Sequence, residues 1–199
     1  KDIASRAALE ALRDASMSPA DVDALFIGSM ASGHFAGQEH IAPLVSSHLG
    51  LNNVPAVRCE AACASGVAAF RQAYLSVASG ASNVALVVGV EKMTDLGSAD
   101  VISGLMSAGD NEWEGSIGLT FSGLYALMAR AHMSAFGTTR EQLAMVSVIN
   151  HDHATKNPLA QFPHKITVDD VLSSSLVADP LRLLDCSPIT DGAAALVLV

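Results

Sequence analysis

The chain has 199 residues, of which 50% are hydrophobic, 16% charged and 5% aromatic. This length fits one ordinary domain, or a domain that carries a large excursion. Acidic residues outnumber basic ones by 20 to 11 and give a net charge of −9, which argues against nucleic acid as the main partner. A phosphorylated cofactor is compatible with this charge, because it needs only a few local cations.

The cysteines and the hydropathy pattern predict the cellular compartment of the protein. Cys59, Cys63 and Cys186 are an odd number at unrelated spacings, so we expect no disulfide scaffold and a reducing compartment. No run has the length of a transmembrane helix, and no charged-then-apolar leader opens the chain. We therefore expect a cytoplasmic protein without membrane contact. The chain opens inside a helical pattern and closes on an apolar run, which predicts a piece of a longer protein.

The first part of the chain, residues 1–93, alternates between helix and strand patterns. Ser18-Pro19 has the pattern of an N-cap followed by proline in the first turn. Apolar strands that alternate with helices indicate a parallel sheet covered on both faces, so the predicted fold class is α/β. Helices are expected over residues 2–16, 38–49 and 67–75, and strands over 24–28, 55–57 and 84–90.

The alternation stops after Met93. From Thr94 to about Asp179 the pattern is helical or irregular, which predicts a separate domain or an inserted excursion. Helices are expected over residues 119–136 and 139–155, the second capped by Thr138 or Thr139. The sheet pattern returns at 183–185 and ends in a core strand at 193–199. The expected parts are therefore 1–93, 94–179 and 180–199.

The segment with the clearest chemical potential is Glu60-Ala61-Ala62-Cys63-Ala64-Ser65-Gly66, between an expected strand and an expected helix. A cysteine at such a turn lies beside unpaired backbone N–H groups and the positive end of a helix dipole. Both favour the thiolate, which is the reactive form, and the N–H groups can also hold an oxyanion. The alternative is a small inert thiol buried among alanines, and these residues alone favour neither.

Three segments in this order resemble the thiolase superfamily, and within it the sterol-carrier-protein-type thiolases and acetyl-CoA acetyltransferases. The first is Cys63-Ala64-Ser65-Gly66, similar to the family's nucleophile turn. The second is residues 150–162, in which Asn150-His151 is followed by Asn-Pro and Ala-Gln-Phe. The third is residues 180–195, and Gly89 to Met93 resembles the end of the family's central strand.

The resemblance implies a two-half α/β/α/β/α enzyme with a mixed, mostly parallel sheet, working as a homodimer or homotetramer. This chain would be most of the N-terminal half without its first strand, plus a helical excursion over residues 94–179 that covers coenzyme A. The implied reaction is acyl transfer between acyl-CoA and CoA through a thioester on Cys63, with formation or cleavage of a carbon–carbon bond. CoA and acyl-CoA are substrates, and no resident cofactor is expected.

The resemblance also places other catalytic groups outside this chain. The activating histidine, a second cysteine and the residue that holds a water in one oxyanion hole lie in the C-terminal half, so we expect the chain alone to be inactive. Some archaeal members of this branch work with a small partner protein that has a zinc ribbon and an OB-fold, which makes such a partner an expectation here.

Other residues have competing interpretations. His151, Asp152 and His153 are adjacent, and adjacent residues on a helix point in different directions, so we predict no metal site. The resemblance instead suggests that His151 shapes the acyl pocket. We expect structural roles for Cys59 and Cys186. Candidates for the CoA phosphates are Lys92, Arg130, Lys156 and Lys165, and candidates to line an acyl tunnel, or simply to pack, are Met106, Met128, Met133 and Met145.

Two alternatives to a thiolase stay open on the sequence. A β-ketoacyl-synthase-like condensing enzyme has the same fold and also acylates a cysteine, although residues 157–162 and 180–195 favour thiolase. The other alternative is a non-catalytic acyl-CoA or lipid-binding subunit of a complex.

Overall fold

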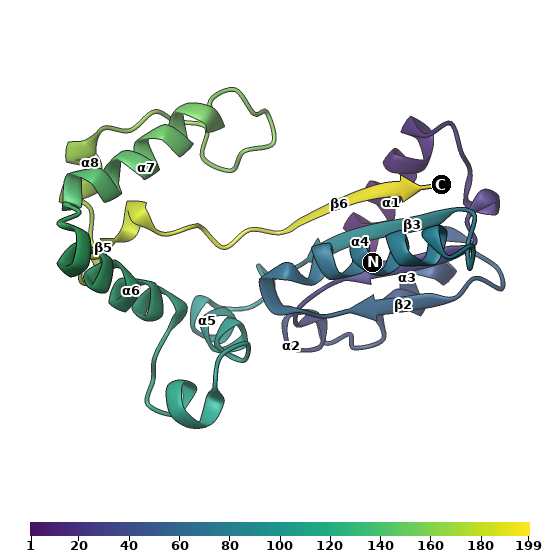
Figure 1. Cartoon of the computed structure of the whole chain (residues 1–199), viewed down its shortest axis with the longest axis horizontal. Coiled ribbons are helices and arrows are strands. Elements are labelled where there is room, and N and C mark those ends of the chain that lie inside the picture. Colours follow the sequence, from purple (N-terminus) through teal and green to yellow (C-terminus); the bar gives the residue numbers. More distant parts are fainter. The chain divides into compact units, whose positions relative to one another are not determined.

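The computed structural model describes residues 1–199, and the chain divides into two compact units (Figure 1). The first, here called the core unit, is Lys1–Gly104 together with Thr190–Val199. The second, the helical unit, is Leu105–Ile189. The divisions inferred from the sequence lie after residues 93 and 179.

The core unit contains one four-stranded sheet in the order β2-β1-β3-β6. The strands β1 (Ala24–Gly28), β2 (Ala56–Cys59) and β3 (Ala85–Glu91) are parallel, and β6 (Gly192–Leu198) is antiparallel to β3. The prediction of a mixed, mostly parallel sheet in an α/β fold is therefore confirmed.

Helices cover the two faces of this sheet with different side chains. On one face, α1 (Asp2–Asp14) and α3 (Ile41–Leu49) form an apolar core with alternate strand residues, such as Leu25 and Ile27 of β1. On the other face, the small residues of α4 (Ser65–Ala78) pack against the strand residues whose side chains point the opposite way, such as Val87 of β3. The period of two along each strand thus decides which helix a side chain meets.

The strand β6 differs from the expected core strand. Its residues alternate between partly buried and exposed, and Leu196 is 39% exposed. The physical reason is that β6 is the last strand in the sheet order, and α4 packs mainly over β1 and β3. An apolar groove of about 330 Å³ is left beside α4, with Val67, Phe70 and Leu196 among its lining residues.

The helices of the core unit largely follow the sequence pattern. Ser18 and Asp21 cap a short 3₁₀ turn over Pro19–Asp21, as the Ser-Pro pattern predicts. The helix expected from residue 38 begins only at Ile41, and a separate short helix, α2 (Ser32–Ala36), precedes it. Gly37 separates the two helices with φ of 63°, a left-handed conformation that favours glycine.

The helical unit consists mainly of α6 (Phe121–Phe136), α7 (Arg140–Ala154), α8 (Val168–Ser173) and the two-stranded hairpin of β4 (Leu176–Ala178) and β5 (Leu181–Arg182). Two further elements are α5 (Ser98–Met106), which crosses the division between the units, and a π-helical turn over Asn111–Gly115. Thr139 caps α7, as expected, by accepting from the N–H of Gln142.

None of the chain's helices combines the length and hydropathy needed to span a bilayer.

The prediction of a strand over residues 183–185 is wrong. These residues form one turn of 3₁₀ helix, Leu183–Asp185, because the Asp185 carboxylate turns back and accepts from the N–H of Arg182 at 2.8 Å. Cys186 follows this turn and therefore does not lie in a strand. The central sheet resumes only at Gly192.

A single carboxylate ties the end of β3 to the start of β6. Asp191 accepts from the N–H groups of Met93 and Thr94 at 2.7 and 3.0 Å, and from the Thr94 hydroxyl at 2.6 Å. It also pairs with the Lys92 ammonium at 2.8 Å. Burial alone would raise the pKa of Asp191, but these donors hold that pKa well below its usual range.

We predict that Asp191→Asn lowers the free energy of unfolding at pH 7 by about 1–3 kcal/mol, because the amide loses the ion pair and acceptor capacity. The depressed pKa of Asp191 adds stability above the ordinary aspartate pKa of about 4, and this stability is lost as the pH falls below that value. Denaturant titrations of both proteins from pH 7 to pH 3 should therefore show the difference shrinking in acid.

The matched control is Asp95→Asn, since Asp95 also pairs with Lys92 but its side chain is 65% exposed. Its effect should stay within about 0.5 kcal/mol. Equal effects of the two substitutions would contradict a special role for Asp191.

Candidate active site

The carboxyl ends of the parallel strands bring three segments to one edge of the sheet. Ser29 follows β1, the turn that contains Cys63 follows β2, and Glu91 ends β3. In open α/β sheets this edge is where ligands bind. The candidate site therefore begins with the residues that shape this edge.

Two charged side chains fix the chain where it leaves β1. Arg58 donates to the carbonyl oxygens of Ser29 at 3.2 Å and Met30 at 2.6 Å, and pairs with Glu39 at 2.8 Å. Glu91 accepts from the Ser29 hydroxyl at 3.1 Å and from the N–H of Met30 at 2.7 Å. No sequence pattern considered above predicts this network, although charged residues at the ends of otherwise apolar strands are its signal.

Cys63 lies in a one-turn 3₁₀ helix, Ala62–Ala64, which leads directly into α4. Ala62 has φ of +48°, a strained left-handed conformation for a residue with a side chain. The buried Ser65 hydroxyl bridges the turn by donating to the Ala62 carbonyl at 2.6 Å and accepting from the N–H of Ala61 at 3.0 Å. Glu60 accepts from the N–H of Ala62. The backbone is thus held on both sides of the thiol.

The three thiols differ in accessibility. Cys63 is exposed, whereas Cys59 and Cys186 are partly buried. Burial raises the pKa of the Cys59 thiol, which disfavours its reactive thiolate. The alternative that Cys63 is buried among alanines does not hold, and Cys63 is the thiol that a reagent or substrate reaches most readily.

The positive end of a regular helix lies next to Cys63. The helix α4 has 14 residues, and its N-cap, Ala64, provides no side-chain cap for the first-turn N–H groups. The N–H of Ser65 is bound to the Ala62 carbonyl oxygen, so an anion would use the later N–H groups of the first turn, where the helix dipole favours negative charge. A thiolate or an acyl oxyanion at this turn would be stabilised by the same donors.

Close backbone packing sets the position of this helix end. A Cβ atom added to Gly28 at the end of β1 would lie 2.5 Å from the Ser65 carbonyl oxygen and 2.6 Å from the Gly66 nitrogen. Only glycine lets the first turn of α4 approach β1 this closely. On the other side of the contact, a Cβ added to Gly66 meets nothing within 4 Å.

The candidate residues of the helical unit are engaged with neighbours. His151 Nδ1 lies 2.9 Å from the carbonyl oxygen of His164. Asp152 pairs with Lys165 and Lys156 at 3.0 and 3.4 Å, which holds the pKa of that carboxyl below its usual value. No group of three or more His, Cys, Asp or Glu side chains is arranged to hold a metal ion.

The cations proposed for the CoA phosphates are all paired with carboxylates. Lys92 pairs with Asp191 and Asp95, Lys156 and Lys165 share Asp152, and Arg130 pairs with Asp179. Lys156, Lys165 and Arg130 remain well exposed, so a ligand can still reach them. Cys63 belongs to the core unit, and His151 belongs to the helical unit.

We predict that Gly28→Ala lowers the free energy of unfolding by about 1–3 kcal/mol, because the new methyl group displaces the backbone of the first turn of α4. It should also change the rate at which iodoacetamide alkylates Cys63, measured peptide by peptide by mass spectrometry. The control, Gly66→Ala, adds its methyl group to open space and should stay within about 1 kcal/mol. Indistinguishable behaviour of the two variants would contradict the close contact.

The chain matches the family model described as thiolase, N-terminal domain, over residues 1–199. It is 54% identical over 198 residues to an acetyl-CoA acetyltransferase of Methanothermobacter thermautotrophicus, covering 100% of this chain and 51% of that protein. It is 32% identical over 204 residues to sterol carrier protein 2 of Gallus gallus, covering 99% of this chain and 37% of that protein. The chain thus spans about half the length, or less, of these curated relatives.

A solved structure gives the same result for the fold. The Ltp2-ChsH2(DUF35) aldolase superposes with a TM-score of 0.76 at 29% sequence identity, over 98% of this chain and 49% of that one. The resemblance inferred from the three sequence segments is therefore confirmed for family and fold.

Proposed function

Since this chain belongs to the family of thiolase N-terminal domains, we propose that the protein containing it is an acyl-CoA C-acyltransferase with Cys63 as its nucleophile. The observation that carries the proposal is the exposed thiol in a fixed, strained turn at the uncapped N-terminus of α4. The similarity to acetyl-CoA acetyltransferase supports acetyl-CoA as a substrate.

The proposed reaction has two steps. The Cys63 thiolate attacks the carbonyl carbon of an acyl-CoA, the bond from that carbon to the CoA sulfur breaks, and CoA leaves as a thiol after taking a proton. In the synthetic direction, the enolate of a second acyl-CoA then attacks the thioester carbon and releases the Cys63 thiolate. In the degradative direction, the Cys63 thiolate attacks the 3-keto carbon of a 3-ketoacyl-CoA, the bond between the second and third carbons breaks, and acetyl-CoA leaves as an enolate that takes a proton. The thiolate of CoA then attacks the thioester carbon and releases a shortened acyl-CoA and the Cys63 thiolate.

In this proposal, the chain contributes the nucleophile and part of its electrostatic environment. The first-turn N–H groups of α4 lie next to the thiol and favour negative charge. The family resemblance assigns the activating histidine and the second cysteine to the C-terminal half, so turnover is proposed only for the complete protein. The excursion over residues 94–179 is proposed to cover CoA, with His151 shaping the acyl pocket.

The assembly and cellular setting belong to the same proposal. We propose a cytoplasmic enzyme of lipid metabolism that works as a homodimer or homotetramer. A partner protein with a zinc ribbon and an OB-fold is supported by the similarity to an aldolase in which Ltp2 is joined to ChsH2(DUF35). No observation favours the β-ketoacyl-synthase alternative over the matched thiolase family.

We predict that the protein made from the complete reading frame gains one acetyl group when it is incubated with acetyl-CoA. Intact-protein mass spectrometry detects this thioester directly. Cys63→Ala should abolish the adduct, because the acyl acceptor is gone, whereas Cys186→Ala should retain it, because Cys186 is partly buried and outside the turn. The 199-residue chain alone should acylate far more slowly, since the proposed base is absent.

Two outcomes would contradict this proposal. Retention of the adduct in Cys63→Ala would move the nucleophile elsewhere. Absence of any adduct in the complete protein, with CoA binding and folding confirmed, would favour the non-catalytic acyl-CoA-binding role.

A further inference from the structure

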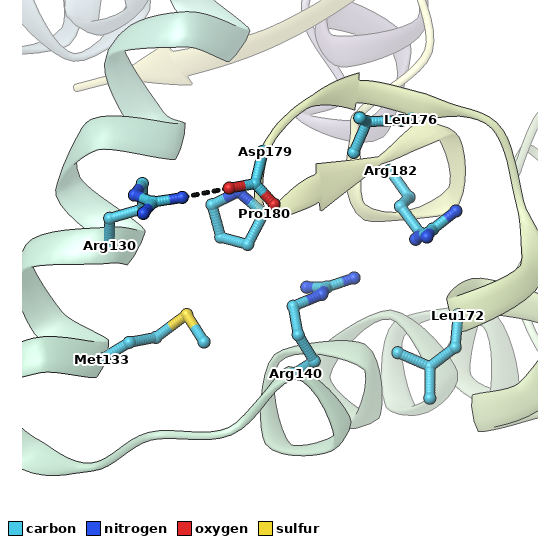
Figure 2. Close-up of a pocket in the computed structure, with 8 residues that line it drawn as sticks. All are labelled: Arg130, Met133, Arg140, Leu172, Leu176, Asp179, Pro180 and Arg182. Carbon is cyan, nitrogen blue, oxygen red and sulfur yellow. Dashed lines mark hydrogen bonds and ion pairs between the residues drawn. The ribbon is translucent and has the colours of Figure 1, made fainter.

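A pocket of about 360 Å³ in the helical unit has an unusual concentration of arginine (Figure 2). Arg130 comes from α6, Arg140 from the start of α7 and Arg182 from β5, so three elements bring cations to one cavity. Figure 2 shows the guanidinium groups of Arg140 and Arg182 pointing toward each other across it.

The three arginines differ in their carboxylate partners. Asp179 pairs with Arg130 and also lines the pocket, and Asp185 pairs with Arg140 at 2.8 Å. Arg182 forms no ion pair and donates instead to the Ser174 carbonyl oxygen. Arg182 is therefore the one guanidinium of the three without a carboxylate partner, and like charges that face each other in a partly buried site repel.

One donor in this cluster is buried without an acceptor. The Nη1 atom of Arg140 is inaccessible to solvent and has no hydrogen-bond partner, while its Nη2 atom is bound to Asp185. The Asp185 side chain is only 5% exposed, so this part of the site is shielded from water. A charged donor left without a partner in such a place costs free energy, so Asp185 alone does not satisfy the Arg140 guanidinium.

We propose that this pocket is a binding site for a phosphate group, either free inorganic phosphate or a phosphate monoester. Guanidinium groups match the tetrahedral oxygens of phosphate with pairs of charge-assisted hydrogen bonds. The apolar side chains of Leu172 and Leu176 also line the cavity. All residues that line the pocket belong to the helical unit, whereas Cys63 belongs to the core unit.

The test is a calorimetric titration of the complete protein with inorganic phosphate at fixed ionic strength. We expect saturable binding that Arg182→Gln weakens about tenfold or more, since a charge-assisted hydrogen bond contributes at least that much. Asp179→Asn should tighten binding severalfold, because it frees Arg130 and removes a negative charge from the pocket. A gain of affinity does not arise from misfolding, so this variant keeps the test decisive.

The matched control is Arg6→Gln, which removes a cation from α1 whose side chain is 83% exposed. Its phosphate affinity should equal that of the unaltered protein. The proposal is overturned if phosphate shows no saturable binding, or if Arg6→Gln weakens binding as much as Arg182→Gln does. It is also overturned if Asp179→Asn fails to tighten binding.

Competition identifies the source of the phosphate. Displacement of bound phosphate by CoA, but not by 3′-dephospho-CoA, would assign the pocket to the nucleotide phosphate of the substrate. Simultaneous binding of phosphate and CoA would assign it to a free anion. Both results uphold the site, and because the readout is binding rather than turnover, its failure is distinct from failure of the proposed acyl transfer.

Discussion

The contact between the first turn of α4 and the end of β1 is the constraint on which the candidate site depends. Backbone packs directly on backbone there, because Gly28 has no side chain to separate β1 from Ser65 and Gly66. This contact fixes where the chain emerges from the sheet, and the preceding turn must therefore be short. This turn has a left-handed conformation at Ala62 and is bridged by the hydrogen bonds of the Ser65 hydroxyl. Cys63 is exposed as a consequence, although its neighbours in the sequence are small residues typical of a core.

Charged side chains have different roles in the two units. In the core unit, Arg58, Glu91 and Asp191 each bind backbone groups of neighbouring loops, so they hold those loops at the ends of strands. In the helical unit the ion pairs on Asp152 and Asp179 are exposed, and such pairs contribute little to stability. The partly buried pair of Arg140 and Asp185 is different, since it leaves one donor unsatisfied. A stabilising role explains the first group of charges, whereas we propose a phosphate ligand for the arginine pocket.

The sequence patterns failed where tertiary contacts override local preference. Leu183-Leu184-Asp185 has the composition of a strand start, but the Asp185 carboxylate bends it into a 3₁₀ turn by binding Arg182 and Arg140. The terminal strand has the composition of a core strand, yet it lies at the end of the sheet order, where Leu196 is partly exposed. The hairpin of β4 and β5 went unpredicted, because its strands are too short to produce a period. Each of these errors concerns which segments of the chain contact one another, and a local sequence pattern carries no information about that.

The sequence by itself determined the α/β class, the parallel strands β1 to β3 and their helices, and the place of Cys63 at a strand-to-helix turn. These follow from hydropathy periods and turn residues, which act over a few neighbouring positions. It also identified the family, through three motifs in a fixed order. Only the tertiary structure decided that Cys63 is exposed while Cys59 is partly buried, and that Arg130, Arg140 and Arg182 share one cavity. Burial and convergence depend on packing between segments far apart in the chain, so they arise only when the fold brings those segments together.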